Sequence, residues 1–383
     1  MKKILFWGDS PTHATGFSNV MHNIITNLPK DEYDPYVLGI NYNGEEHYFP
    51  YKIYTVEKRP DNPVGVLSFM SVIKETDFDI IFIISDVWVI DKMVPFIKQS
   101  GTEAKLVAYI PVDAEDHNPE WYSGLDIFSK VVMYNKFGLD VAKDAAPDLP
   151  YEVIPHGIDP RFHKLSSKLE VRKHLFPSRP ELWDAFIFLN ANRNQPRKRL
   201  DITLRAFKKF ARDKKNIYLY LHSGVKDIHV DLVRISKKLG IDDKIIFTSE
   251  GEGIQNIPTE ELNLIYNACD VGLNTGVGEG FGLCNVEHAL TGAPQVVPKH
   301  SALADIHKDT AVFIPADIDF TLEFISVTAK LVLVDDVVNA MSRIYRDKTL
   351  YRKLSEKSIK KFSSPEYDWK EIGKQWSNLF NNL

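Results

Sequence analysis

Short runs of β-branched and aromatic residues recur along this chain, and longer stretches with helical periodicity separate them. Strands that alternate with helices form parallel sheets through βαβ crossovers. We therefore predict an α/β protein with two doubly wound sheets in tandem and a ligand crevice between the domains, at the carboxyl ends of the strands. The predicted strands are 4–8, 36–40, 80–85, 106–110, 131–134 and 151–154 in the first half, and 186–190, 218–222, 245–248, 271–274, 295–297 and 312–314 in the second.

The length of 383 residues suits two α/β domains of ordinary size. We place the first domain at 1–160 and the second at 161–363, with a polar linker stretch from about 155 to 180. Residues 364–383 carry aromatic and aliphatic side chains at helical spacing and predict a helix with one apolar face that needs a packing partner.

Charge and cysteine content exclude several classes of protein. Acidic residues outnumber basic ones by 52 to 47, so no global positive field indicates a nucleic-acid partner. The two cysteines, Cys269 and Cys284, have neither a disulfide framework nor metal-ligand spacing, and we expect a cytoplasmic protein. The most apolar run, 80–84, is too short to cross a bilayer, although peripheral membrane contact stays open, as does the oligomeric state.

The segment 278–287, Gly-Glu-Gly-Phe-Gly-Leu-Cys-Asn-Val-Glu, is the most informative motif. It places Glu279 in a glycine-rich loop and Glu287 about one turn into the following helix. The amides near Phe281, Gly282 and Leu283 lie at the start of that helix, where backbone N–H groups favour an anion. Two carboxylates beside an anion site suit a nucleotide sugar. The alternative is an ordinary strand-to-helix turn with Glu287 on a solvated face.

A basic loop follows the first predicted strand of the second half. Arg193 offers a two-pronged contact and Lys198 a compact charge, and together they suit a diphosphate and the charge that develops on it as a leaving group. The role of the neighbouring Arg197 is open, and a solvated basic loop is the alternative. Two Asp-x-Asp patterns occur, one at 77–79 just before a predicted strand and one at 317–319 in a predicted loop. Both are too short to be informative, so we expect no required metal and no cofactor.

The first half offers two candidate positions at the ends of predicted strands. Gly16 lies where a strand turns into a helix, and amides at such a start can meet phosphate or sugar oxygens. Asp113, with His117 four residues later, follows the strand at 106–110. A polar side chain at this edge of a parallel sheet would face the predicted crevice.

Glu279 and Glu287, followed by Gly-Ala-Pro-Gln-Val-Val at 292–297, resemble the E-x7-E signature of the GT-B glycosyltransferases, especially family 4. Within that segment, His288 departs from the family pattern. The segments 192–199 and 155–162 resemble the family too. The resemblance implies two Rossmann-like domains and a retaining transfer of a hexose-type sugar from a nucleoside-diphosphate sugar to a carbohydrate or glycoconjugate acceptor (a glycan, a lipid-linked sugar or a glycoprotein). It also implies that the last helix crosses back to the first domain.

The resemblance assigns roles to individual residues. It implies that Glu279 orients hydroxyls of the donor sugar, that Glu287 holds the ribose, and that Arg193 and Lys198 hold the phosphates. Asp113 stands near the anomeric carbon, where the family often has a His-Asp pair. A nucleotide-sugar epimerase of the same fold is one alternative. A homologue that binds nucleotide sugar without turnover is another, because Asp113 stands in place of the more usual His. A nicotinamide dehydrogenase is weaker, because the glycine spacing at 278–282 is not G-x-G-x-x-G.

Overall fold

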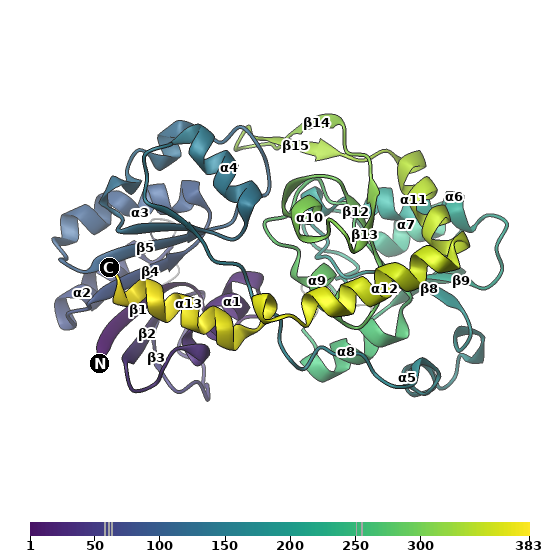
Figure 1. Ribbon diagram of the computed structural model, residues 1–383, viewed down its shortest axis with the longest axis horizontal. Coiled ribbons are helices and arrows are strands. Elements are labelled where there is room, and N and C mark those ends of the chain that lie inside the picture. The colour runs from purple at the N-terminus through teal and green to yellow at the C-terminus, as the bar shows by residue number, and fades with distance from the viewer. Residues whose placement is uncertain (57–58, 60–61, 63, 250, 254–255) are drawn as a thin grey trace. The chain divides into compact units, whose positions relative to one another are not determined.

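The computed structural model describes residues 1–56, 59, 62, 64–249, 251–253 and 256–383 (Figure 1). The chain divides into two compact units. The first contains Met1–Gly157 and Glu366–Leu383, and the second contains Ile158–Pro365. Each unit is built on a parallel sheet with its own apolar core.

The first unit contains a seven-stranded parallel sheet in the order β3-β2-β1-β4-β5-β6-β7. The chain runs outward from β1 to β3 and then returns to β4 on the other side of β1. The strand order therefore reverses between β1 and β4, and the carboxyl ends of strands at such a point are the usual place for a ligand in an open α/β sheet. The strands are β1 (Lys2–Asp9), β2 (Tyr33–Ile40), β3 (Lys52–Thr55), β4 (Ile80–Ile84), β5 (Lys105–Ile110), β6 (Lys130–Met133) and β7 (Tyr151–Val153).

Successive side chains of each central strand point to opposite faces of this sheet. Both sets are buried, because helices cover both faces. Leu5 and Trp7 belong to the core beneath α2 and α3, and the Trp7 ring stacks on Phe69 with a centroid distance of 4.6 Å. On the other face, Phe82 packs edge-on against Trp376 at 5.1 Å. The helices of this unit are α1 (Gly16–Asn27), α2 (Val66–Glu75), α3 (Val87–Ser100), α4 (Lys136–Ala145) and α13 (Trp369–Asn381).

The C-terminal helix α13 is part of the first unit, although it is the last element of the chain (Figure 1). It packs along α1, where a Cβ on Gly373 would lie 2.3 Å from the backbone oxygen of Asn27. At the other end of the helix, Gly157 lies against the ring of Trp369, which leaves no room for a side chain. The aromatic face of α13 is therefore buried against the first sheet and helix α1.

The second unit contains a six-stranded parallel sheet in the order β10-β9-β8-β11-β12-β13. Strand β11 lies directly beside β8, so the loops that follow these two strands leave the sheet at the same edge. The strands are β8 (Phe186–Asn190), β9 (Ile217–Leu221), β10 (Ile245–Phe247), β11 (Val271–Leu273), β12 (Gln295–Pro298) and β13 (Ala311–Ile314). The helices are α5 (Lys168–Leu175), α6 (Leu200–Ala211), α7 (Leu232–Leu239), α8 (Thr259–Ala268), α9 (Leu283–Leu290), α10 (Ser301–Ile306), α11 (Val334–Arg346) and α12 (Lys348–Phe362).

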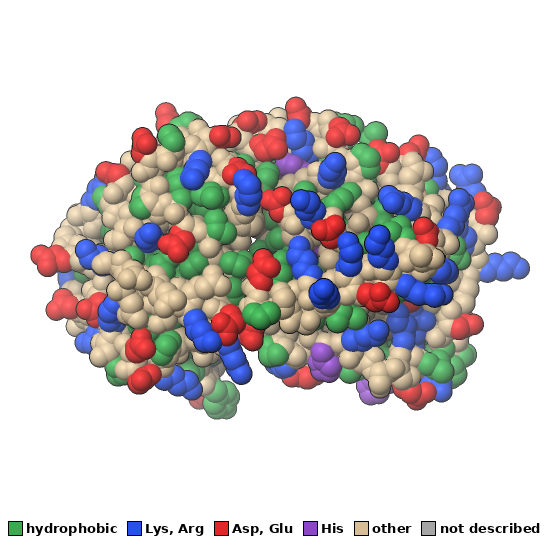
Figure 2. Space-filling model, in the orientation of Figure 1, with side chains coloured by type: hydrophobic (Ala, Val, Ile, Leu, Met, Phe, Trp, Pro, Cys, Tyr) green, Lys and Arg blue, Asp and Glu red, His purple; other side chains and the backbone are tan. Residues whose placement is uncertain are grey.

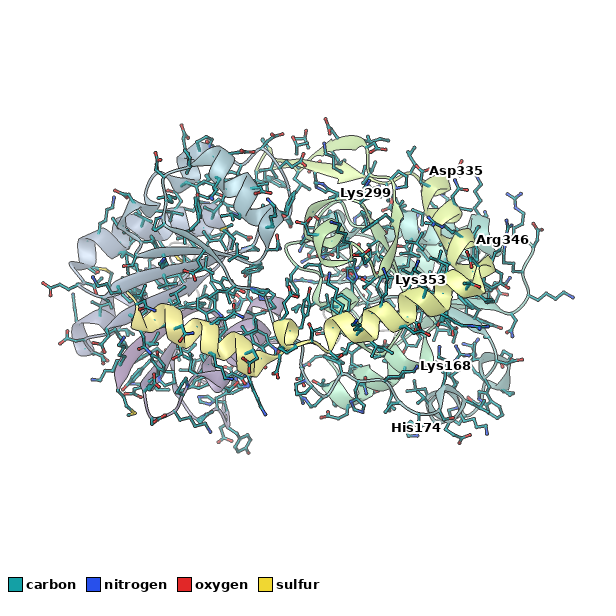
Figure 3. All side chains as sticks on the ribbon, viewed as in Figure 1. Lys168, His174, Lys299, Asp335, Arg346 and Lys353 are labelled. Carbon is teal, nitrogen blue, oxygen red and sulfur yellow. The ribbon has the colours of Figure 1, made fainter. Side chains whose placement is uncertain are left out.

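Basic side chains gather on the surface of the second unit around α12, as Figure 2 shows. Among them is Lys353, which is labelled in Figure 3 and is exposed to solvent. A charge in this setting is strongly hydrated, so it contributes little to folding. Lys353 therefore provides a reference against which a buried lysine of the same unit can be compared.

The prediction of two tandem α/β units with doubly wound parallel sheets is confirmed, and three local predictions need correction. Strand β3, in which only Ile53 is buried, was not predicted. Residues 168–175 were expected within a linker but form α5, which packs on α8. The Asp-x-Asp pattern at 317–319 was expected in a loop, but Ile318–Thr321 forms strand β14, which pairs antiparallel with β15 (Thr328–Leu331).

Candidate active site

The glycine-rich loop between β11 and α9 adopts a conformation that only glycine accommodates at its last position. Gly282 caps α9 with a φ of 83°, and a Cβ there would lie 2.6 Å from Leu303 Cδ2. The left-handed conformation and the lack of space both favour glycine. Glu279 lies in the same loop, and its backbone N–H donates a hydrogen bond of 2.9 Å to Ser301 Oγ.

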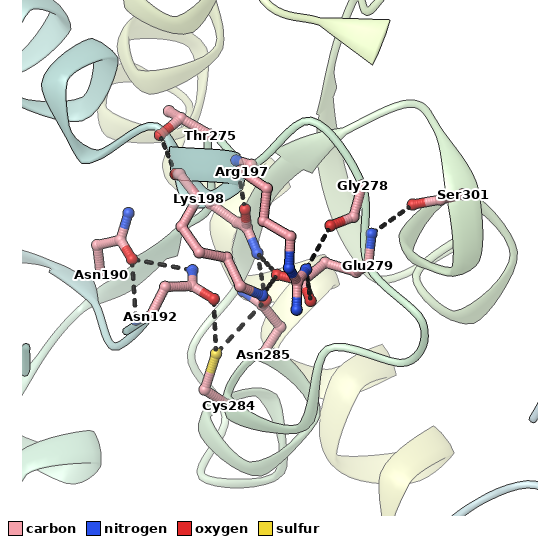
Figure 4. Close-up of polar contacts among 12 residues, drawn as sticks. Asn190, Asn192, Arg197, Lys198, Thr275, Gly278, Glu279, Cys284, Asn285 and Ser301 are labelled. Carbon is pink, nitrogen blue, oxygen red and sulfur yellow. Dashed lines mark hydrogen bonds and ion pairs between the residues drawn. The ribbon is translucent and has the colours of Figure 1, made fainter. Parts of the chain in front are cut away.

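Glu279 is 4% exposed and lies beside two cations from the loop that follows β8 (Figure 4). The buried Lys198 ammonium contacts Glu279 Oε1. Arg197 Nη1 lies 3.7 Å from Glu279 Oε2 and donates a hydrogen bond of 3.0 Å to the carbonyl of Gly278. Burial opposes ionisation of Glu279, but Lys198 and Arg197 outweigh it and hold the pKa of this carboxyl below its usual value. Glu279 is therefore an ionised, oriented carboxylate.

Burial acts in the opposite direction on Lys198. Loss of solvent, followed by repulsion from Arg197, lowers the pKa of the Lys198 ammonium, and the contact with Glu279 counteracts both effects. The pair holds opposite charges in a dry environment, where interactions with an incoming charged group are less screened than in water.

A chain of buried side-chain amides also holds Glu279. Asn274 Nδ2 donates to Glu279 Oε1 at 3.0 Å and to Asn285 Oδ1 at 2.9 Å. Asn285 Nδ2 in turn donates to Gln295 Oε1 at 3.0 Å. Each amide can satisfy its partner in one orientation only, so the chain sets the rotamer of the carboxylate.

Glu287 is also buried, but its electrostatic state differs from that of Glu279. The Tyr266 hydroxyl donates a hydrogen bond of 2.9 Å to Glu287 Oε2. Burial raises the pKa of Glu287 to about 8, although the hydrogen bond from Tyr266 lowers it in part. The two glutamates of the motif are thus one ionised carboxylate and one carboxyl that is largely protonated at neutral pH. The alternative of Glu287 on a solvated helix face does not hold.

Arg193 and Lys198, which the sequence suggested as a phosphate-binding pair, have different partners in the structure. The Arg193 guanidinium contacts both oxygens of Asp227, at 2.6 and 3.2 Å, and is partly exposed. Lys198 contacts Glu279 together with Arg197, whose role the sequence left open. The structure therefore brings together Arg197, Lys198 and Glu279, while Asp227 engages Arg193.

The remaining donor-site candidates of the second unit lie at the start of α9. Phe281 is buried, and Leu283 is the first residue of the helix. The amides of Asn285 and Val286 already donate to the carbonyl of Gly282, at 2.9 and 3.2 Å. The amides that precede them in the chain therefore define the anion-favouring end of α9.

Two candidates lie in the first unit, at the carboxyl ends of its strands. Gly16 is exposed and begins α1, whose N-terminus is capped by Thr15: the Thr15 side chain accepts from Ser18 N at 3.1 Å and donates to Asp9 at 2.7 Å. Asp113 is half-buried in the segment after β5. It acts electrostatically on His117, whose Nδ1 bonds the Tyr122 hydroxyl at 2.8 Å.

Several side chains of the site carried no signal in the sequence. Asn274, Asn285, Gln295, Ser301 and Tyr266 are common residue types in no recognisable pattern. Their one shared sequence property is that each is a polar residue next to or within an otherwise apolar run. Only their hydrogen bonds in the folded chain identify them as part of the network around the two glutamates.

Neither Asp-x-Asp pattern forms a metal site in the part of the chain that the structure describes. Asp79 accepts a hydrogen bond of 2.7 Å from the amide of Lys3, and Asp319 pairs with Lys330 at 2.5 Å. No group of three or more His, Cys, Asp or Glu side chains within the described residues has an arrangement that would hold a metal ion. No helix among these residues is both long and apolar enough to cross a bilayer.

This chain resembles known proteins in the sequence of its second unit and in its fold. Residues 172–361 match the family described as glycosyl transferases group 1. The fold is similar to that of sucrose-phosphate synthase from Thermosynechococcus elongatus, with a TM-score of 0.78 and 15% sequence identity over 100% of this chain and 99% of that chain. It is also similar to Anabaena HepE in complex with UDP-glucose, with a TM-score of 0.73 and 18% identity over 100% of both chains. No curated protein matches the chain in sequence.

Proposed function

We propose that this chain, whose residues 172–361 match the family described as glycosyl transferases group 1, transfers a hexose-type sugar from a nucleoside-diphosphate sugar to a hydroxyl acceptor. The observation that carries this proposal is the buried contact between Lys198 and Glu279, with Arg197 beside it. An anion-binding cation and a hydroxyl-binding carboxylate at one point suit the place where a diphosphate joins a sugar.

Each residue of this cluster has a task in the proposed reaction. Arg197 and Lys198 stabilise the negative charge that develops on the diphosphate as the bond between the anomeric carbon and the phosphate oxygen breaks. The electron pair of that bond leaves with the phosphate oxygen. Glu279 accepts hydrogen bonds from sugar hydroxyls, and Asn274 keeps it in place.

The remaining assignments rest on the resemblance to the E-x7-E glycosyltransferases. Glu287 holds the ribose, and the amides around Phe281, Gly282 and Leu283 support the sugar or phosphate oxygens. Arg193 reaches the phosphates once it leaves Asp227. For the first unit, the resemblance assigns a donor-binding role to Gly16 and a catalytic role to Asp113.

The chemical outcome follows from the same motif. The acceptor oxygen bonds the anomeric carbon on the face that the phosphate leaves, and the acceptor proton passes to the departing phosphate oxygen. The anomeric configuration is therefore retained. The two cations take the place of a metal ion, so the reaction requires none.

A donor screen tests this proposal directly. The purified protein is incubated with UDP-, GDP- and ADP-sugars, and thermal stabilisation is measured. UDP-glucose is the first choice, since the Anabaena protein of similar fold binds it. Incubation of the best donor without acceptor separates the alternatives, because epimer formation would indicate an epimerase. Stabilisation without turnover on any acceptor would indicate a binding protein.

Matched variants test the site. Glu279→Gln and Arg193→Ala are expected to abolish transfer while the circular dichroism spectrum stays unchanged. Glu356→Gln, an exposed glutamate on α12, is the control and is expected to retain full activity. Wild-type activity in Glu279→Gln would remove the assignment of this site.

A further inference from the structure

Backbone conformations that are costly for most residues occur next to the buried ion pair of the second unit. A positive φ is unfavourable for a residue with a Cβ, and residues held in it often mark functional sites. In the described part of the second unit, four residues other than glycine have a positive φ. Phe324 and Ser326 lie in the exposed turn between β14 and β15. The other two are Arg199, which follows the lysine of the pair directly, and Ser301, which contacts the glutamate.

Ser301 is the first residue of α10, in the segment that follows β12, and it is 3% exposed with a φ of 53°. Its Oγ accepts a hydrogen bond of 2.9 Å from the backbone N–H of Glu279 (Figure 4). The next residue, Ala302, donates its own N–H to the carbonyl oxygen of Glu279 at 3.3 Å. Two consecutive residues of α10 therefore bind both backbone polar groups of Glu279.

The hydroxyl explains why a serine suits this position. Glycine adopts a positive φ without steric cost, so it would be the better residue for the backbone of Ser301 alone. A glycine, however, would leave the N–H of the buried Glu279 without its acceptor, and an unpaired buried N–H is costly. The hydrogen bond to Glu279 thus offsets the conformational cost of a left-handed serine.

The backbone and the side chain of Glu279 are held by different elements. Asn274, which follows β11, binds the carboxylate, whereas Ser301 and Ala302 bind the backbone from α10. The ammonium of Lys198 reaches the same carboxylate from the loop that follows β8. A shift of the Glu279 backbone would therefore separate the two charges, and their attraction weakens with distance and with the entry of water.

We propose that Ser301 is a positioning residue, whose hydroxyl fixes the backbone of Glu279 so that the carboxylate stays in contact with Lys198. In the reaction proposed above, Glu279 binds hydroxyls of the donor sugar, so its displacement slows transfer. That consequence rests on the proposed function, whereas the effect of Ser301 on the ion pair does not.

A double-mutant cycle measures the ion pair without any substrate. The free energy of unfolding in urea is compared for the full-length protein, Lys198→Met, Glu279→Gln and the double variant, which gives the coupling between the two side chains. The same four proteins are then made with Ser301→Gly, which accommodates the positive φ but lacks the hydroxyl. The coupling is expected to fall by about half or more.

Ser326→Gly is the matched control for the cycle. Ser326 has a φ of 56°, close to that of Ser301, but it is exposed. The coupling in this background is expected to equal that of the wild type. All proteins are checked by circular dichroism. Should Ser301→Gly fail to fold, Ser301→Cys takes its place, since it is similar in size but its sulfur accepts hydrogen bonds only weakly, and the same fall is expected.

Kinetics with the donor that the screen identifies give a second readout. Ser301→Gly is expected to lower kcat by about 10- to 100-fold, because a small displacement of a group that acts in the transition state costs rate. The donor KM should change less. A serine with a purely structural role would lower the melting temperature without changing the kcat of the folded protein.

Equal coupling in the Ser301→Gly and Ser326→Gly backgrounds would overturn the proposal. The cycle needs neither donor nor acceptor, so this result does not depend on whether the protein transfers a sugar. Reduced coupling with an unchanged kcat would support the positioning by Ser301 and contradict the role of Glu279 in the proposed function.

Discussion

The Asn274 side-chain amide donates a hydrogen bond of 3.0 Å to Glu279 Oε1, the same carboxylate oxygen that the Lys198 ammonium contacts. The other hydrogen of that amide is used at Asn285, 2.9 Å away. Asn274 thus connects the ionised glutamate to Asn285 and, through it, to Gln295 at the start of β12. The orientation of Glu279 therefore depends on Asn274 and, through it, on two further buried amides, Asn285 and Gln295.

Asn274→Ala is expected to lower kcat by about 10- to 100-fold, since a hydrogen bond to a charged group contributes about 1.5–3 kcal/mol. The donor affinity should change less, because the cations that hold the phosphates remain. Steady-state kinetics together with calorimetric titration of the donor separate the two effects. Asn216→Ala, in which an exposed asparagine of the same unit is removed, is the control. If kcat is the same in both variants, Asn274 does not position Glu279.

Lys198→Ala is expected to destabilise the protein by about 3–5 kcal/mol, because the Glu279 carboxylate then loses its closest cation while it stays buried. The double variant Lys198→Met/Glu279→Gln should be more stable than Lys198→Ala, since it removes both charges. Urea denaturation of the full chain gives the comparison, with the exposed Lys353→Ala as control. A Lys198→Ala variant as stable as Lys353→Ala would contradict the buried ion pair.

Glu287 makes the stability depend on pH. Its pKa is about 8 in the folded protein and 4.5 in a free glutamate, so the folded chain binds one proton more than the unfolded chain between these values. This contribution is fully present below pH 4.5, declines as the pH rises, and is lost above about 8. The expected slope is about 1.4 kcal/mol per pH unit.

Glu287→Gln should remove that slope. The free energy of unfolding of this variant and of the wild type is compared across the same pH range by urea denaturation, and the difference between them isolates the group. Parallel curves for the two proteins would show that Glu287 titrates normally. Glu356→Gln, which removes an exposed carboxyl, is expected to give a curve parallel to the wild type.

Gly282→Ala is expected to weaken donor binding and lower the melting temperature, because the new Cβ would lie 2.6 Å from Leu303 Cδ2 at a φ of 83°. Gly240→Ala is the matched control. Gly240 also has a positive φ, 66°, but nothing lies within 4 Å of its Cβ position. Gly240→Ala should therefore lower the free energy of unfolding only by the cost of backbone strain, about 1 kcal/mol. The added variant Gly282→Ala/Leu303→Ala should recover part of the donor affinity. Equal effects in the two single variants would argue against the steric explanation.

The sequence predicted the elements whose apolar signal is strong and local. The run Ile80–Ile84 is buried at every position, and its strand was predicted within one residue. By contrast, β3 has one buried residue in four, and β14 has none, so neither rises above its polar surroundings. Helix α5 was missed because its composition is polar and its packing depends on α8, almost a hundred residues later.

The candidate site divides in a similar way. Glu279, Glu287 and Lys198 were predicted individually, from a glycine-rich turn and from a basic loop after a strand. Their roles stay predictions until the variants are measured. The sequence paired Lys198 with Arg193, but the structure pairs it with Glu279, 81 positions away along the chain. No local pattern encodes a contact at that separation.

The sequence by itself determined the alternation of strands and helices, the glycine that the turn at Gly282 requires, and the types of charged group available near it. These properties depend on periodicity and on the conformational range of single residues, which are local. The tertiary structure alone decided that Lys198 meets Glu279 and that Asn274, Asn285 and Gln295 hold the carboxylate. Those contacts exist because β11 pairs in parallel with β8, between Val271 and Phe188 and between Gly272 and Leu189, which brings the two loops to one edge of the sheet.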